Sequence, residues 1–311
     1  MGSIVAPVPC DDSENRATLE AIVHIPDGFL STPVWAALDA AAAPAVYFVA
    51  RRAQRGFDDS RAPLLGVMGA FVFAAQMINF PVGLGTSTHL VGGALLAFTL
   101  GPAPASVVMA AILAIQALVF QDGGILALGA NTINMAVVGV LAGYLPYQLW
   151  GTTRGRRAAI FAGAALSVLT SALLALSELL LSGVRMPGSI LAVSLGLFVV
   201  SAAAEGVITV AVIRALESIQ PGFIRKPSPQ RSFALAAVAL AAVLLATGGV
   251  LVASASPDGI EKLGQARTFI TTPLAGYQIS ALGGGWLAKA GAGLAGLGLV
   301  YGACVLIGRK R

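Results

Sequence analysis

Residues 157–182 read RAAIFAGAALSVLTSALLALSELLLS, and this stretch decides the fold class of the chain. After Arg157 at its start, Glu178 is its only charged residue. The run exceeds the length of about 20 apolar residues that a helix needs to span the hydrocarbon core of a bilayer. We therefore expect a membrane-spanning helix here.

The same pattern recurs along the whole chain. Hydrophobic residues make up 57% of the 311 residues and charged residues only 11%, whereas soluble domains carry about 25% charged residues. We predict an all-α fold, a polytopic transmembrane helical bundle of about nine hydrophobic segments, with seven in a core and two in a C-terminal hairpin. The other eight runs are 34–50, 62–80, 90–101, 104–120, 129–149, 190–213, 233–253 and 285–307.

The distribution of positive charge predicts the orientation in the membrane. If the first run starts outside, 14 of the 19 Lys and Arg residues fall in inside loops, helix ends or the C-terminal tail, as the positive-inside rule requires. This bias predicts a multi-pass protein with an outside N-terminus and a cytoplasmic C-terminus. The short third run, 90–101, could instead be a broken or partly re-entrant helix, which is tolerated only where protein buries it or it lines a cavity.

Two polar segments suggest the domain organisation. Residues 1–22 contain four acidic residues and lack the hydrophobic stretch of a secretory signal. Residues 217–232 contain three prolines and predict a cytoplasmic linker. This linker separates a membrane domain, 23–216, from a two-helix hairpin, 233–311, whose loop at about 254–284 faces outside. The basic clusters are short and lie between apolar runs, so we expect membrane lipid and no nucleic acid as a partner.

The chain has two histidines, His24 and His89. The predicted topology places both at the outer ends of neighbouring spans, where they could meet. Imidazole is a ligand for nickel, cobalt, copper and zinc. From the residues alone, a metal site and two unrelated interfacial histidines are equally good interpretations.

Four sequence blocks indicate a family. Residues 24–31 (HIPDGFLS) resemble the N-terminus of the CbiM/NikM family, whose members begin Met-His-Ile and continue to Gly-Phe-Leu. Residues 85–93 (GTSTHLVGG) resemble its second-histidine motif, and 116–124 (QALVFQDGG) with 128–131 (LGAN) resemble its middle loop. Residues 205–209 (EGVIT) resemble its last core helix. The blocks follow the family order, so the chain resembles the substrate-binding (S) component of an energy-coupling-factor (ECF) importer for cobalt or nickel.

The resemblance implies a set of metal ligands. They are the N-terminal amine at Val23, the backbone nitrogen and imidazole of His24, and the imidazole of His89. Amine and amide close a five-membered chelate ring, while amide and Nδ1 close a six-membered one. Four such nitrogens suit Ni²⁺ and can take Co²⁺, each as the transported ion; no catalytic cofactor is expected.

The chain departs from the family pattern at its start. His24 stands at position 24 rather than 2, and an internal residue has no free amine. A valine codon can serve as a bacterial start codon that is decoded as Met, so we expect translation to begin at Val23 and residues 1–22 to be a non-native leader. A cleaved leader, or an altered or lost site, remains as the alternative interpretation.

The resemblance also implies partners. Residues 256–262 (SPDGIEK) resemble the Pro-Asp-Gly-Leu-Glu segment of the small CbiN/NikN-type components, which are often fused behind the CbiM/NikM part. The sequence has no Gly-x4-Gly-Lys-Ser/Thr phosphate-binding loop. ATP hydrolysis is therefore expected in separate CbiO/NikO-type ATPase subunits, joined through a CbiQ/NikQ-type transmembrane coupling (T) subunit.

We therefore predict a non-enzymatic transport subunit of the bacterial cytoplasmic membrane, with its metal site facing outside. It would supply cobalt for cobalamin synthesis or nickel for nickel enzymes. A metal-dependent membrane enzyme and a secondary ion-coupled carrier are the alternatives.

Polar residues inside apolar runs are costly and often functional. We expect Asp39 to lie on a face of the first helix that meets the coupling subunit or packs within the bundle, and the amides Gln76, Asn79, Asn131 and Asn134 to bind loop backbone.

Overall fold

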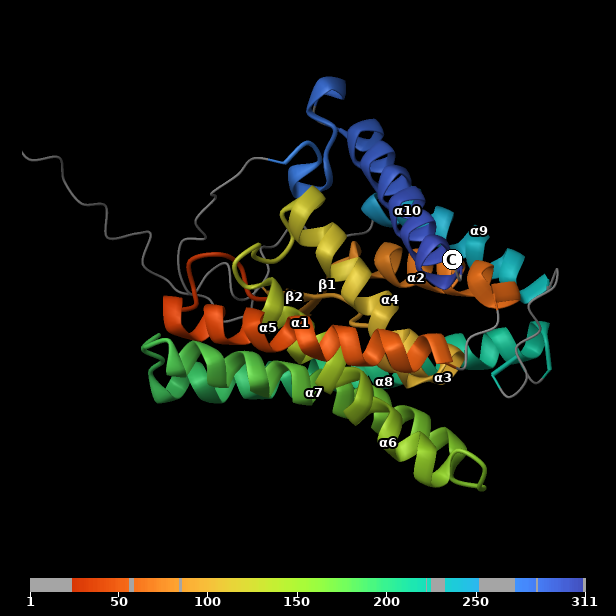
Figure 1. The fold of residues 1–311 in the computed structure, drawn as a ribbon, viewed down its shortest axis with the longest axis horizontal. Coiled ribbons are helices and arrows are strands. Elements are labelled where there is room, and N and C mark those ends of the chain that lie inside the picture. The colour runs from red at the N-terminus through yellow and green to blue at the C-terminus, as the bar shows by residue number, and fades with distance from the viewer. Residues whose placement is uncertain are drawn as a thin grey trace, which may run out of the picture.

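The computed structural model describes residues 24–55, 59–83, 86–221, 223–224, 233–251, 272–283 and 285–309, and every structural statement below concerns these residues. They form ten α-helices and one short β-hairpin (Figure 1). Four sequence predictions fall outside them. These are the leader 1–22, the ligand Val23, the segment 256–262, and residues 225–232 of the linker.

The elements follow one another in this order. The helices are α1 (Thr32–Arg55), α2 (Ala62–Gln76), α3 (Gly93–Leu100), α4 (Pro102–Ile115), α5 (Leu128–Asn131), α6 (Val140–Trp150), α7 (Arg156–Leu181), α8 (Gly188–Ile219), α9 (Phe233–Gly248) and α10 (Trp286–Gly308). The strands β1 (Phe80–Gly83) and β2 (Thr86–Thr88) pair antiparallel. Two π-helical segments extend α4 (Gln116–Phe120) and join α5 to α6 (Thr132–Gly139). Single 3₁₀ turns lie at Asp59–Arg61, Gly249–Leu251, Ala275–Tyr277 and Ser280–Leu282.

Each of the nine apolar runs contains a helix, and six helical segments are long and apolar enough to cross a membrane. The chain is therefore a polytopic, helical membrane protein. The six are Thr32–Arg55, Pro102–Phe120, Leu128–Trp150, Arg156–Leu181, Gly188–Ile219 and Trp286–Gly308. The other three runs form α2, α3 and α9, with 15, 8 and 16 residues. The β1–β2 hairpin is an addition to the all-α prediction, and it lies in the loop before His89.

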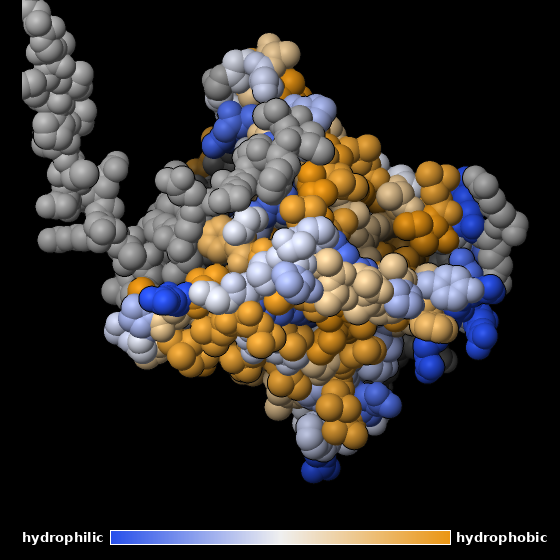
Figure 2. All heavy atoms as spheres, turned by 60° about the vertical axis from the view of Figure 1, so that its left-hand side comes forward, coloured by the Kyte–Doolittle hydropathy of each residue, from blue (hydrophilic) through white to orange (hydrophobic). Residues whose placement is uncertain are grey.

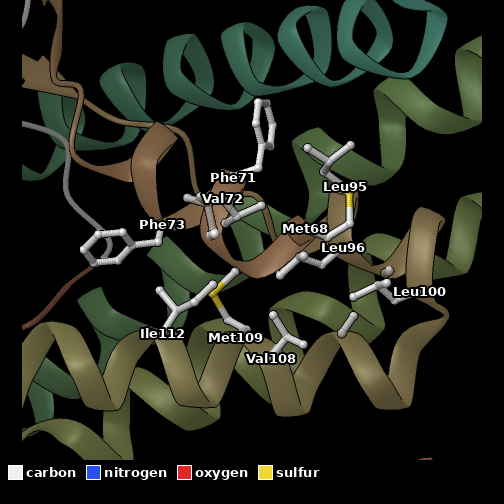
Figure 3. Close-up of a cluster of buried hydrophobic side chains, with 14 of the residues drawn as sticks. Met68, Phe71, Val72, Phe73, Leu95, Leu96, Leu100, Val108, Met109 and Ile112 are labelled. Carbon is white, nitrogen blue, oxygen red and sulfur yellow. The ribbon is translucent and has the colours of Figure 1, made fainter. Parts of the chain in front are cut away.

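The bundle packs around α2, α3 and α4. Figure 3 shows the centre of this core, where Val72 and Phe73 of α2 meet Leu96 of α3 and Met109 of α4. Around it, α7 packs on α6 and α8, α1 lies on α4 and α5, and α10 lies on α2 and α9. Hydrophobic side chains cover much of the outer face drawn in Figure 2, with hydrophilic ones mainly at its edges. Such a surface suits lipid rather than water.

Small residues let α10 approach α2 closely. A Cβ added to Gly66 would lie 2.6 Å from Cδ2 of Tyr301, and one added to Gly69 would lie 3.0 Å from Sγ of Cys304. All of α2 except Pro63 and Ala75 is buried. Close helix approach at small residues is typical of packing in membranes.

The third apolar run is a broken helix, because only its second part is helical. The eight residues of α3 are all buried, and at about 1.5 Å per residue they extend only about 12 Å. Residues 89–92 precede the helix in non-helical conformation. Gly92 has a φ of +75°, and a Cβ there would lie 2.5 Å from Cγ1 of Val72. The break therefore depends on glycine at this position.

We expect Gly92→Ala to lower the free energy of unfolding by about 2 kcal/mol, because the new methyl overpacks the core and the backbone is left-handed. Gly298→Ala is the control, since nothing lies within 4 Å of that position in α10. The midpoint of thermal unfolding in detergent measures both effects. Equal midpoints for the two variants would contradict the strained start of α3.

Candidate metal site

The two histidines lie next to each other in the interior. Their ring centroids are 5.0 Å apart, with 39° between the ring planes. His24 is 3% exposed and His89 is 8% exposed. The sequence prediction that the two residues could meet is therefore consistent with the fold, which brings the start of the described chain against the loop after β2.

Backbone contacts fix the segment that carries His24. Asn131 of α5 binds both backbone groups of Ile25, as its Oδ1 accepts the N–H at 2.8 Å and its Nδ2 donates to the carbonyl oxygen at 3.0 Å. The carboxylate of Asp27 accepts the N–H groups of Ile125 and Leu126 at 3.0 and 2.8 Å. Gly28, with a φ of +95°, turns the chain toward α1. The segment is thereby held as part of the core.

Glu205 of α8 fixes the segment that carries His89. Its two carboxylate oxygens accept the N–H groups of Val91 and Gly92 at 2.9 and 2.8 Å. The side chain of Gln76 donates to the carbonyl oxygen of Val91 at 2.7 Å. Non-helical backbone at membrane depth needs partners of this kind, since no water is available to satisfy it. Glu205 thus explains how the chain can be extended beside His89.

Asp122 is the polar neighbour of the histidine pair. Its Oδ1 lies 3.2 Å from Nδ1 of His24. Burial alone would raise the pKa of Asp122, but the charge and hydrogen bond of His24, together with His89 and Tyr277, lower it to about 2. The carboxylate is therefore ionised at neutral pH and can only accept, so Nδ1 of His24 donates.

His89 is neutral in this environment. Burial and the adjacent His24 lower its pKa to about 4, although Asp122 and the Leu90 carbonyl act in the opposite direction. Its Nδ1 lies 3.0 Å from the Leu90 carbonyl oxygen. Because a carbonyl oxygen only accepts, Nδ1 carries the proton and Nε2 keeps its lone pair. A neutral imidazole with a free nitrogen is the form that binds a metal ion.

Protein side chains alone do not complete a metal site here. Within the described ranges, no group of three or more His, Cys, Asp or Glu side chains is arranged to hold a metal ion. Among the described residues, the buried Nε2 of His24 has no hydrogen-bond partner. Nδ1 of His24, which the chelate implied by the family resemblance would use, faces Asp122. Two imidazoles need further ligands. The amine that the family resemblance implies, at Val23, lies outside the described residues.

Four of the other polar residues singled out in the sequence have structural partners, while the prediction for Asn79 stays a prediction. Asn131 and Gln76 bind loop backbone, as predicted. Asn134 instead donates to the carboxylate of Glu178 at 2.8 Å. Asp39 accepts the N–H of Gly129 at 2.7 Å and so joins α1 to α5.

Sequence reasoning did not find the roles of Asp122, Asp27 and Tyr277. The first two lie in blocks that carry the family resemblance, and an acid beside glycines could have been picked out as a loop anchor. Tyr277 lies 155 residues from Asp122, to which it donates a hydrogen bond of 2.5 Å. Nothing in the local sequence connects the two.

Comparison with known proteins identifies the family of the chain. Residues 24–223 match the profile of the CbiM family, described as the cobalt uptake substrate-specific transmembrane region. A metal transport protein of Haloquadratum walsbyi is 38% identical over 203 residues, which are 65% of this chain and 93% of that one. The fused nickel transport protein NikMN of Rhodobacter capsulatus is 41% identical over 148 residues, which are 46% of this chain and 42% of that one.

A solved structure supports the same relationship. The crystal structure of a truncated transition metal transporter superposes with a TM-score of 0.57 and 33% sequence identity, covering 63% of this chain and 98% of that one. The fold and these matches therefore define a transmembrane component of cobalt or nickel uptake. The chain belongs to the CbiM family. This places it among transport proteins.

We expect Asn131→Ala to release the His24 segment, because both hydrogen bonds to Ile25 are lost. Amide hydrogen exchange in residues 24–30 should become roughly tenfold faster, as expected when about 1.4 kcal/mol of local stability is lost. Gln148→Ala, which removes an exposed amide on α6, is the control. Mass spectrometry of deuterium uptake measures the change. Equal uptake in both variants would show that Asn131 does not hold this segment.

Proposed function

We propose that the chain is the S component of an ECF importer and captures Co²⁺ or Ni²⁺ on the outer side of the membrane. The observation that carries the proposal is the pair of buried imidazoles whose ring centroids lie 5.0 Å apart. The neutral state of His89 supports it, as does Nε2 of His24, which no described residue contacts by a hydrogen bond. Imidazole nitrogens suit both ions, so the proposal covers both.

The ligands in this proposal are the His89 imidazole, the His24 imidazole and backbone nitrogen, and the amine at Val23 when Val23 begins the chain. For Nδ1 of His24 to enter the chelate, the ring must turn away from its present contact. Nε2 then carries the ring proton, and the carboxylate of Asp122 can accept a hydrogen bond from this N–H group. Carboxylates commonly orient metal-binding histidines in this way.

The membrane arrangement belongs to the same proposal. We infer a domain over 23–216 that captures the metal, a cytoplasmic linker over 217–232 and a CbiN/NikN-like hairpin over 233–311. The chain crosses the cytoplasmic membrane nine times, with its C-terminus inside, because that arrangement puts most basic residues inside. The bidentate pair of Arg156 and Glu217, at 2.8 and 2.7 Å, then joins the cytoplasmic ends of α7 and α8.

Partners of this S component would dock on α1. Ala36, Ala37, Ala40 and Ala41 are all exposed on this helix. A face of small side chains lets another helix approach closely. We propose that a CbiQ/NikQ-type coupling subunit binds there and that CbiO/NikO-type ATPases drive release of the ion inside.

Metal content of the purified protein tests the site. We expect near-stoichiometric nickel or cobalt in protein that starts at Val23 as Met, and loss of that metal in the same protein with His89→Ala, because a ligand is removed. The full chain should retain less metal, since its residue 23 has no free amine. Inductively coupled plasma mass spectrometry measures all three forms and identifies the ion. Equal metal in all forms, or none in any, would refute the site.

The docking face has its own test. Ala40→Leu should reduce co-purification of the coupling subunit at least severalfold and leave the metal content unchanged, because the larger side chain keeps the partner helix away. Val199→Leu on α8 is the matched control, since Val199 is 59% exposed and lies on a different helix. If both variants retain the coupling subunit equally, α1 is not the docking helix.

A further inference from the structure

The segment between α9 and α10 reaches the histidine pair through Tyr277. This residue ends the turn Ala275–Tyr277, and its ring stacks on Phe120 with centroids 4.8 Å apart and 21° between planes. Nearby, the N–H of Leu274 donates to the Val119 carbonyl oxygen at 3.3 Å. The C-terminal part of the chain is thus attached directly to the π-helical end of α4.

The neighbours of the Tyr277 hydroxyl group determine which of them receives its proton in a hydrogen bond. Nε2 of Gln116 lies 3.4 Å from the hydroxyl oxygen, and an amide N–H can only donate. The hydroxyl proton is therefore donated to Oδ2 of Asp122. The other oxygen of the same carboxylate faces Nδ1 of His24. One carboxylate thus links the phenol of the C-terminal part to the imidazole of the N-terminal segment.

The same side chains also connect to the second histidine. Gln116 donates to Oε1 of Gln76 at 3.0 Å, and Gln76 donates to the carbonyl oxygen of Val91, two residues after His89. A continuous series of hydrogen bonds therefore runs from His24 to the His89 segment. Tyr277 stands at its centre, and it is the member contributed by the C-terminal part of the chain.

We propose that Tyr277 is a positioning residue of the metal site, which holds Asp122 so that Asp122 can orient His24 for the ion. The proposal rests on the proposed function, because it assumes that His24 binds metal. Removing a partner of a metal-binding histidine typically weakens metal affinity by about 10- to 100-fold. Since Tyr277 acts through Asp122, its effect lies near the lower end of that range.

The test is metal affinity in Tyr277→Phe, which removes the hydroxyl group and keeps the ring stacked on Phe120. We expect the Kd for Ni²⁺ or Co²⁺ to rise on the order of tenfold. The ligand-field absorption bands of the bound ion should stay in place, because the ligands are unchanged. Tyr301→Phe is the matched control, since that residue lies on α10 and packs near Gly66. The full chain and the form starting at Val23 are both titrated, and the form that retains metal is used.

A double-mutant cycle decides whether Tyr277 acts through Asp122. In an Asp122→Ala background, Tyr277→Phe should change the Kd less than about twofold, because the carboxylate that it holds is absent. A tenfold change in that background as well would overturn the proposal. A Kd for Tyr277→Phe equal to that of the unaltered chain would also overturn it. So would a rise in Kd that comes with a lower midpoint of thermal unfolding, because a general loss of stability would then explain the weaker binding.

The outcomes also separate this proposal from the proposed function. If the unaltered chain binds metal and His89→Ala abolishes binding, the metal site stands, and an unchanged Kd in Tyr277→Phe overturns the role of Tyr277 alone. If neither form of the unaltered chain binds either ion, both proposals are overturned.

Discussion

Every backbone N–H and C=O group inside the bundle needs a partner, and this requirement shapes the histidine site. Side chains far away in sequence supply partners where the chain is not helical. Glu205 takes two N–H groups beside His89, Asp27 takes two from the loop after Asp122, and Asn131 pairs with Ile25. These three side chains therefore bind the backbone that surrounds the histidine pair. Because a buried carboxylate without partners is costly, Glu205 also fixes the register of α8.

The same anchoring makes the site rigid before an ion arrives. Segments from both ends of the chain and from two interior loops converge on Asp122. A backbone that is already fixed around both histidines loses little freedom on binding, so more of the interaction energy contributes to affinity.

Much of the fold could be predicted from the sequence, because bilayer thickness sets the length of an apolar run that forms a spanning helix. All nine runs contain helices, and the broken form of the third was foreseen from its length and its glycines. The meeting of His24 and His89 could be predicted from topology. The partners of these residues could not. Asp122 resembles any loop acid, Asn134 binds Glu178 rather than backbone, and Tyr277 meets its partner only through tertiary packing. Hydropathy reports how deep a segment lies, but it does not report which segments adjoin.

The close contact of α10 with α2 has a consequence for biogenesis. The ribosome completes α2 long before α10, so the groove at Gly66 and Gly69 first faces lipid, or any other helix nearby. The helix α10 later brings the side chains of Tyr301 and Cys304 against these glycines. A nascent or truncated chain that stops before α10 would expose a glycine-lined helix suited to self-association. The order of synthesis therefore sets a period in which this protein depends on its membrane surroundings to prevent incorrect helix pairing.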